Sequence, residues 1–205
     1  MFSSIFKKYT IVFFIITSFT SFDDADPEIL SENLVTADYF NIIDYTFPNF
    51  IFLQKDFIGF KEFLGYKEST SDYKKINKFG FIGKYQFNIN TLKMYKIKNS
   101  QKFINNAELQ ERVFLINVQR NKWILRNDIK WFVGSDIYNT NITESGIIAA
   151  AHLAGPGNVK KYLRSGGKYN PKDAFGTSIS KYMEYFKGYD LSMIKAVKNP
   201  KVMLF

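Results

Sequence analysis

A glutamate and a glutamine flank a glycine-containing loop in one segment of the chain. Glu68 follows a stretch rich in Phe and Leu, and Gln86 comes after Gly80 and Gly83. A carboxylic acid set against apolar walls has a raised pKa and can donate a proton near neutral pH. Cleavage of a glycosidic bond requires such a proton on the leaving oxygen. Glu68 is therefore a candidate general acid, and the alternative is a surface glutamate at a helix end.

A second segment, residues 150–163, contains the single histidine of the chain. His152 follows a run of alanines and precedes Gly155-Pro156-Gly157. A histidine on such a helix either packs in a core or faces a cleft, and the sequence leaves both roles open. The Gly-Pro-Gly stretch lacks the third glycine of a dinucleotide-binding fingerprint. We therefore expect its glycines to shape a junction between two helices.

These two segments together resemble the lysozyme-like superfamily, specifically the soluble lytic transglycosylases and goose-type lysozymes. That family has a Glu-Ser pair, a Gly-x-x-Gln loop some fifteen residues later and an Ala-x-x-Ala-Gly-Pro-Gly-x-Val turn. Glu68-Ser69, Gly83–Gln86 and residues 151–159 match these elements in order and spacing. The resemblance covers about residues 57–186. It implies a mainly α, lysozyme-like single catalytic domain with a small irregular or β element.

The resemblance also implies roles for individual residues. Glu68 would be catalytic, while Ser69, Tyr85, Gln86 and His152 would bind substrate, with no metal and no cofactor. Two positions depart from the family: His152-Leu153 stands where it usually has Tyr-Asn, and Lys84-Tyr85 where it usually has hydrophobic residues. These departures suggest a divergent branch that resembles phage-like secreted muramidases.

The number of catalytic carboxylates separates two reaction outcomes. Hydrolases place a second carboxylate near the acid, and Asp72 and Glu144 are candidates. Asp72 could equally cap a turn, and Glu144 could lie at a helix N-terminus, where an acidic side chain is favourable. Lytic transglycosylases, by resemblance, use one glutamate, which protonates the leaving group and then helps the muramyl C6 hydroxyl close an anhydro ring. We expect this single-acid scheme.

Composition excludes several other chemistries. With no cysteine and one histidine among 205 residues, thiol nucleophiles, thiolate zinc sites and His-rich metal sites are ruled out. The net charge is +9, but from Tyr73 onward 23 basic and 8 acidic residues give +15. A basic body suits an anionic polymer, although a solvated lysine-rich surface would have the same composition. No RRM, OB or helix-turn-helix signature supports a nucleic-acid binder.

Four regions are predicted along the chain. Residues 1–22 read as a signal peptide or N-terminal anchor, with Lys7 and Lys8 before a short apolar run. Residues 23–55 form an acidic, aromatic lead-in, 56–190 the catalytic domain and 191–205 a basic C-terminal tail. We expect an exported monomer, periplasmic or secreted, which touches a membrane only through an uncleaved N-terminal segment.

Periodicity and cap residues predict the elements of the domain. Helices are expected over about 56–67, 107–125 and 173–186, from Thr143 as N-cap to Ala154, and from Pro156 to the glycines at 166 and 167. Residues 78–87 should form a loop or short hairpin.

The function expected from these features is cleavage of the MurNAc–GlcNAc bond in peptidoglycan glycan strands by a single glutamic acid. Alternatives are a chitinase-like hydrolase, a non-catalytic glycan-binding protein of the same fold, and a basic nucleic-acid binder.

Overall fold

The computed structural model describes residues 54–202, and the structural statements below concern that range. The predicted signal segment and almost all of the acidic lead-in lie outside it. The described domain is mainly helical, as predicted. Its helices are α2 (Phe57–Ser69), α3 (Ile89–Met94), α4 (Ser100–Ile104), α5 (Ala107–Phe132), α6 (Glu144–Ala154), α7 (Pro156–Arg164) and α8 (Ile179–Tyr185).

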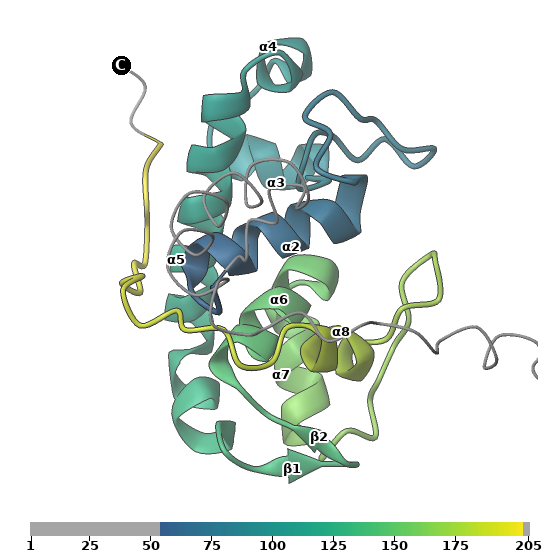
Figure 1. Ribbon diagram of the computed structural model, residues 1–205, viewed down its shortest axis with the longest axis vertical. Helices are drawn as coiled ribbons and strands as arrows, with labels where there is room; N and C mark the ends of the chain where they lie inside the picture. Colours follow the sequence, from purple (N-terminus) through teal and green to yellow (C-terminus); the bar gives the residue numbers. More distant parts are fainter. Residues whose placement is uncertain (1–53, 203–205) are drawn as a thin grey trace, which may run out of the picture. The chain divides into compact units, whose positions relative to one another are not determined.

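Helix α6 is the central element of the domain. It packs against α5, α7 and α8, and residues 145–151 are all buried. A helix that is apolar on all sides needs such surroundings. Figure 1 shows α5 running along one side of the domain, with α2 and α3 beside its upper part and α6 and α7 beside its lower part.

Two packed clusters form the core. One joins α2, the loop that follows it, α3, α4 and the first half of α5, with Phe60, Leu64 and Phe114 at its centre. The other joins the second half of α5 to α6, α7 and α8, with Leu125 and Tyr162 fully buried. Residues of α6 and α8 contribute to both clusters, so the two halves form one continuous interior.

Local sequence signals explain where the helices begin. Asp56, Asn106 and Thr143 each precede a helix, and each side chain accepts a backbone N–H of the first turn, which satisfies a donor that the helix leaves open. Pro156 is the first residue of α7, where a missing N–H costs nothing. The predicted starts at Thr143 and Pro156 are therefore confirmed.

The β elements are small. Strands β1 (Asp136–Ile137) and β2 (Thr140–Asn141) pair antiparallel after α5. Ile82 forms isolated bridges to Ile76 and Phe87, so residues 78–87 make the short hairpin-like loop that was predicted.

Two predicted helices need correction, and two short helices were not predicted. The helix expected from 173 begins only at Ile179, because Ser178 caps it and a bridge between Lys172 and Ser178 folds the preceding residues into a loop. Helix α5 continues past 125 to Phe132. The short helices α3 and α4 were not predicted.

Residues 191–197, predicted as the beginning of a basic C-terminal tail, contact the helices of the domain. Leu191 and Ile194 belong to the core, and the ammonium group of Lys122 donates to the Leu191 carbonyl (2.7 Å). The Val197 N–H donates to the Gln119 carbonyl (3.1 Å). These bonds and the buried apolar side chains attach residues 191–197 to α5, so this segment is part of the domain.

Candidate active site

Glu68 lies in the last turn of α2 and is half-buried. The hydroxyl of Tyr182, on α8, donates a hydrogen bond to its Oε1. Burial, together with the charge of Glu68 and this hydrogen bond, raises the pKa of Tyr182 well above its ordinary value. Tyr182 therefore stays protonated and acts as a fixed donor that holds the Glu68 carboxylate in one orientation.

Two other ionisable groups belong to the same electrostatic neighbourhood. The negative charge of Asp173, in the loop before α8, contributes to the raised pKa of Tyr182. The charge of Glu68 acts on His152, whose pKa is lowered mainly by burial and partly restored by Glu68 and by the Tyr85 carbonyl. Glu68 thus interacts with Tyr182 through a hydrogen bond and with His152 through its charge, and the charge of Asp173 acts on Tyr182.

The loop after α2 presents Gln86 beside this group. Gln86 has a φ of 47°, an uncommon conformation for a non-glycine residue. Its Nε2 donates to the carbonyls of Gly83 (2.8 Å) and Lys75 (3.3 Å). Its Oε1 is buried and has no hydrogen-bond partner among the described residues. Such an unpaired buried acceptor is costly unless a water molecule or a ligand donor reaches it.

A cleft of about 270 Å³ opens next to Gln86 and His152. Its polar walls come from the start of α3, from α5 and from the loop: Gln86, Asn88, Thr91, Asn117, Arg120 and Asn121. Phe87, Leu153 and Pro156 supply apolar surface. Amides, a hydroxyl and one guanidinium around apolar faces suit a polar, neutral ligand such as a sugar. Glu68 does not line this cleft, and its charge acts on His152, which does.

The hydrogen bonds of His152 define its tautomer. Nε2 lies 2.8 Å from the Tyr85 carbonyl, an acceptor, so Nε2 carries the proton. Nδ1 then accepts from the Asn117 amide at 3.4 Å. With both nitrogens engaged by protein groups, His152 presents its ring to the cleft and positions the Gln86 loop. The predicted contact of His152 with substrate would therefore be made by the ring and not by its nitrogens.

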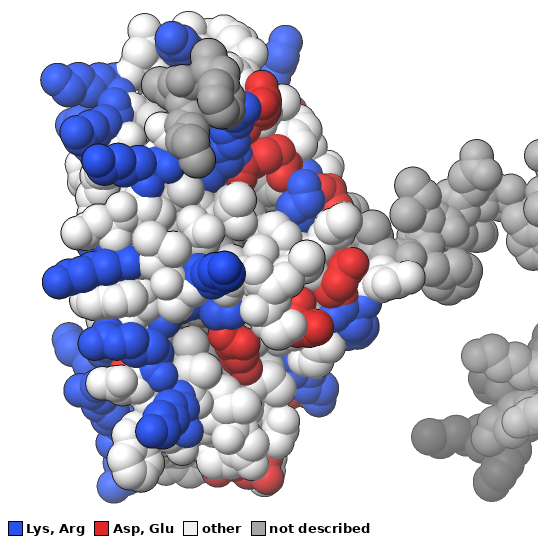
Figure 2. All heavy atoms as spheres, turned by 90° about the vertical axis from the view of Figure 1, so that its left-hand side faces the viewer, with Lys and Arg blue, Asp and Glu red and all other residues white. Residues whose placement is uncertain are grey.

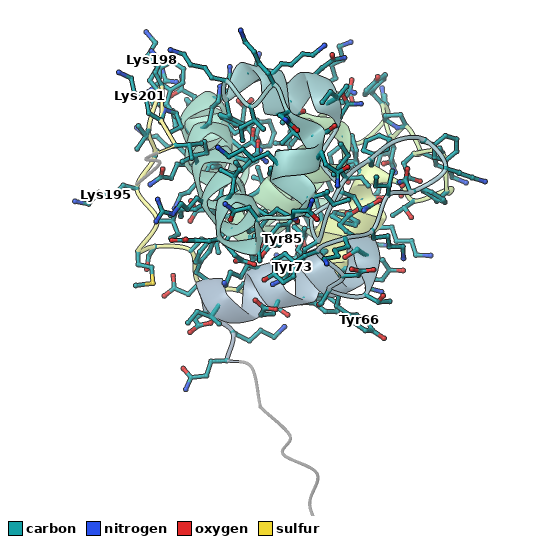
Figure 3. All side chains as sticks on the ribbon, turned by 90° about the horizontal axis from the view of Figure 1, so that it is seen from above. Tyr66, Tyr73, Tyr85, Lys195, Lys198 and Lys201 are labelled. Carbon is teal, nitrogen blue, oxygen red and sulfur yellow. The ribbon has the colours of Figure 1, made fainter. Side chains whose placement is uncertain are left out.

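Tyr85 was predicted to bind substrate, and the structure places it elsewhere. Its side chain is fully buried and stacks on Phe114 at a centroid distance of 4.0 Å. Its hydroxyl donates to Glu111 of α5 at 2.8 Å, and Tyr73 donates to the same oxygen at 2.7 Å. Figure 3 shows Tyr73 and Tyr85 next to each other beside α2. Tyr85 therefore anchors the loop to α5.

Lys84 explains how a charged residue fits into this loop. Its side chain is 3% exposed, and its ammonium group contacts Glu62 (2.8 Å) and Glu111 (2.9 Å). Burial alone would lower the pKa of Lys84, but the hydrogen bonds that it donates to Glu62, Glu111 and Tyr73 raise it. The long side chain crosses α2 at Gly65, where a Cβ would lie 2.6 Å from Lys84 Cε.

Glu111 is the anionic centre of this network. Burial would raise the pKa of its carboxyl group, but hydrogen bonds from Lys61, Tyr73, Lys84 and Tyr85 lower it to about 2. The network links α2, α5 and the loop, so the charged pair Lys84–Glu111 holds the loop that carries Gln86.

Ser69, also predicted to bind substrate, is fully buried. Its hydroxyl donates to the carbonyls of Lys84 (2.8 Å) and Gly65 (3.2 Å) and accepts from the Asp72 N–H (3.0 Å). These contacts leave the hydroxyl no surface for a sugar. Ser69 instead fastens the end of α2, and with it Glu68, to the loop.

The two carboxylates considered as partners of Glu68 have structural roles. Asp72 accepts the Lys74 N–H at 2.8 Å in an exposed turn. Glu144 lies in the first turn of α6 and pairs with Lys122 at 2.9 Å. Asp173, which sequence reasoning missed, is the carboxylate that acts on the Tyr182–Glu68 pair.

Tyr182 is the other residue that the sequence did not reveal. It lies in a helix whose Tyr, Met and Phe residues read as core, and nothing in its spacing points to Glu68.

Within residues 54–202, no group of three or more His, Asp and Glu side chains is placed to hold a metal ion. No helix in that range has the length and apolar character needed to span a membrane.

Comparison of the chain with protein-family models, with curated proteins and with solved structures finds no match.

Proposed function

We propose that this chain is an exported enzyme of lysozyme-like fold that cleaves the MurNAc–GlcNAc bond of peptidoglycan, with Glu68 as its general acid and base. The observation that supports it best is the hydrogen bond from the buried Tyr182 hydroxyl to the Glu68 carboxylate, beside the loop that carries Gln86. A general acid must be held within reach of the leaving oxygen, and this donor fixes the carboxyl group in orientation.

The chemistry assigned to Glu68 has two stages. Its protonated carboxyl group donates to the leaving glycosidic oxygen while the sugar develops oxocarbenium character. The resulting carboxylate then accepts a proton from the attacking hydroxyl. The hydrogen bond from Tyr182 to Oε1 holds the carboxyl group of Glu68 in the orientation that both transfers require.

Gln86 and the neighbouring cleft supply recognition. Gln86 lines the cleft, and its buried, unpaired Oε1 would accept the amide N–H of a glycan N-acetyl group once the loop exposes it. The amides of Asn88, Asn117 and Asn121 line the same cleft and suit sugar hydroxyls, which both donate and accept. Apart from Arg120, the polar side chains of the cleft are uncharged amides, a hydroxyl and His152, which is consistent with a glycan.

The attacking group in the second stage is proposed to be the muramyl C6 hydroxyl. Besides Glu68, Asp173 is the carboxylate whose charge acts on Tyr182. Its Oδ1, however, accepts hydrogen bonds from the N–H groups of Phe175 (2.9 Å) and Thr177 (2.7 Å). A carboxylate committed to its own turn is poorly suited to activate water, which favours the single-acid scheme and an anhydro product.

Digestion of purified sacculi with the chain tests this function. Mass spectrometry should find soluble muropeptides that end in anhydro-muramic acid. Reducing ends instead would indicate hydrolysis, and loss of that activity in Asp173→Asn would identify its base. Binding to sacculi without release of fragments would contradict the proposal and favour a glycan-binding protein. Cleavage of chitin oligomers but not of sacculi would favour a chitinase-like enzyme.

A further inference from the structure

A second cavity, of about 510 Å³, lies between the α3–α4 connection and the C-terminal segment. We call it the lysine-rimmed groove. Its floor and walls are largely carbon and come from Met94, Tyr95, Ile97, Leu109, Pro200 and Val202. Its size is in the range of pockets that hold small molecules, which are lined mainly by apolar residues with a few charged groups.

Four lysines stand around this groove: Lys96, Lys98, Lys102 and Lys201. All four are exposed. None of them forms an ion pair within residues 54–202, and no acidic residue lines the groove. Figure 2 shows Lys and Arg crowded along one margin of the face that carries the C-terminal segment. In Figure 3, Lys195, Lys198 and Lys201 project outward from that segment.

Two neutral polar groups at the groove, the Tyr95 hydroxyl and Asn99 Oδ1, already have partners in the protein. The Tyr95 hydroxyl donates to Asn117 Oδ1 at 3.0 Å, which leaves only its ring toward the groove. Asn99 Oδ1 accepts the Lys102 N–H at 2.9 Å. A peptide would need partners for its backbone amides, and a free phosphate would leave the apolar floor unused. A hydrocarbon chain joined to an anionic head group uses both parts of the groove.

We propose that the lysine-rimmed groove binds an anionic phospholipid, with an acyl chain over the apolar floor and the phosphate among the four lysines. Lysine ammonium groups on flexible stems attract anionic head groups, and the effect accumulates with their number. Such binding holds the domain at an anionic membrane surface. The inference does not depend on glycan cleavage, because it concerns a different cavity and a different ligand.

The test is co-sedimentation of the full chain with vesicles. One set is phosphatidylcholine with one third phosphatidylglycerol, and the other is phosphatidylcholine alone. The groove variant replaces Lys96, Lys98, Lys102 and Lys201 by Gln. The control variant replaces Lys74, Lys130, Lys168 and Lys172 by Gln. These are also exposed and form no ion pair in the described range, so both variants lose the same charge and keep the N-terminal segment.

The groove variant should lose at least about tenfold in partitioning to the phosphatidylglycerol vesicles, and the control variant less than about threefold. Equal losses would overturn the proposal, because net charge alone would then explain binding. Titration with lysophosphatidylglycerol and with glycerol phosphate separates the lipid from its free head group. Val202→Asn should weaken binding of the first only. Stronger binding of an acidic peptide such as polyglutamate than of the lysolipid would overturn the proposal as well.

Discussion

The Tyr182 hydroxyl donates to Glu68 Oε1 across 114 residues of sequence. This contact joins the end of α2 to α8, which packs on the central helix α6. It converts a glutamate at a helix end into a carboxyl group with a fixed orientation. The proposed catalytic role of Glu68 depends on that orientation.

Tyr182→Phe removes the donor and keeps the ring. Loss of a hydrogen bond to a charged group should lower kcat about 10- to 100-fold with little change in KM, because the bond acts on the reacting carboxylate. The measurement is steady-state cleavage of soluble glycan chains, with thermal unfolding to show that the fold persists. Tyr185→Phe, three positions along the same helix, should leave both constants unchanged.

The pKa of His152 reports on Glu68 without any assay of activity. Burial holds it below the ordinary value of 6.5, and the charge of Glu68 partly offsets this effect. Glu68→Gln should therefore lower the pKa of His152 further. Since the chain has one histidine, its C2 proton gives a single NMR signal to titrate. An unchanged pKa in Glu68→Gln would mean that the two groups do not interact.

The lowered pKa of His152 also predicts a pH dependence of stability. With a folded-state pKa below the unfolded value of 6.5, the unfolded chain takes up the proton first, so stability falls as the pH drops below 6.5. His152→Asn should flatten this part of the stability profile. Denaturant titrations at several pH values measure it.

The lowered pKa of Glu111 predicts a second pH dependence of stability, at a more acidic pH than that of His152. A carboxyl group shifted from 4.5 to about 2 stabilises the fold above pH 4.5, and this contribution disappears as the pH falls toward 2. Glu111→Gln should therefore cost roughly 3 kcal/mol at pH 7 and much less near pH 2. Glu108→Gln, on the exposed face of the same helix, should change the free energy of unfolding by less than about 0.5 kcal/mol.

Alanine substitutions at two glycines of the loop distinguish the effect of backbone strain from the effect of a steric clash. Gly80 and Gly83 have φ values of 79° and 80°, so alanine is strained at both by about 1–2 kcal/mol. Only at Gly83 would the new Cβ meet another group, at 2.1 Å from Gln110 Oε1, which accepts the Lys84 N–H. Gly83→Ala should destabilise the domain more than Gly80→Ala and should also reduce cleavage. Equal effects would show that the Gln110 contact is unimportant.

The sequence predicted the helices that carry clear caps and apolar periodicity. Thr143 and Pro156 mark their helix starts by chemistry that acts within one turn. Helices α3 and α4 are too short to show periodicity, and both follow Asn caps that resemble ordinary loop residues. The loop before α8 was misread because Asp173 and Ser178 fold it through side-chain and bridge contacts that no periodicity reports.

The candidate site was only partly predictable. The motif residues Glu68, Gln86 and His152 do lie in one region, since the charge of Glu68 acts on His152 and both Gln86 and His152 line the cleft. Ser69 and Tyr85 turned out to support the loop from inside. Tyr182 and Asp173 were missed, because contacts between distant parts of the chain depend on how α8 packs rather than on local spacing.

Digestion of purified sacculi by Glu68→Gln, with the wild type and Glu184→Gln beside it, tests the central claim most directly. Gln keeps the shape of Glu68 but cannot deliver a proton, whereas Glu184 is an exposed glutamate paired with Lys187. Wild type and Glu184→Gln should release anhydro-muropeptides, while Glu68→Gln should release none, with an unchanged unfolding transition. Release of muropeptides by Glu68→Gln at the wild-type rate would contradict the assignment of Glu68 as the catalytic acid.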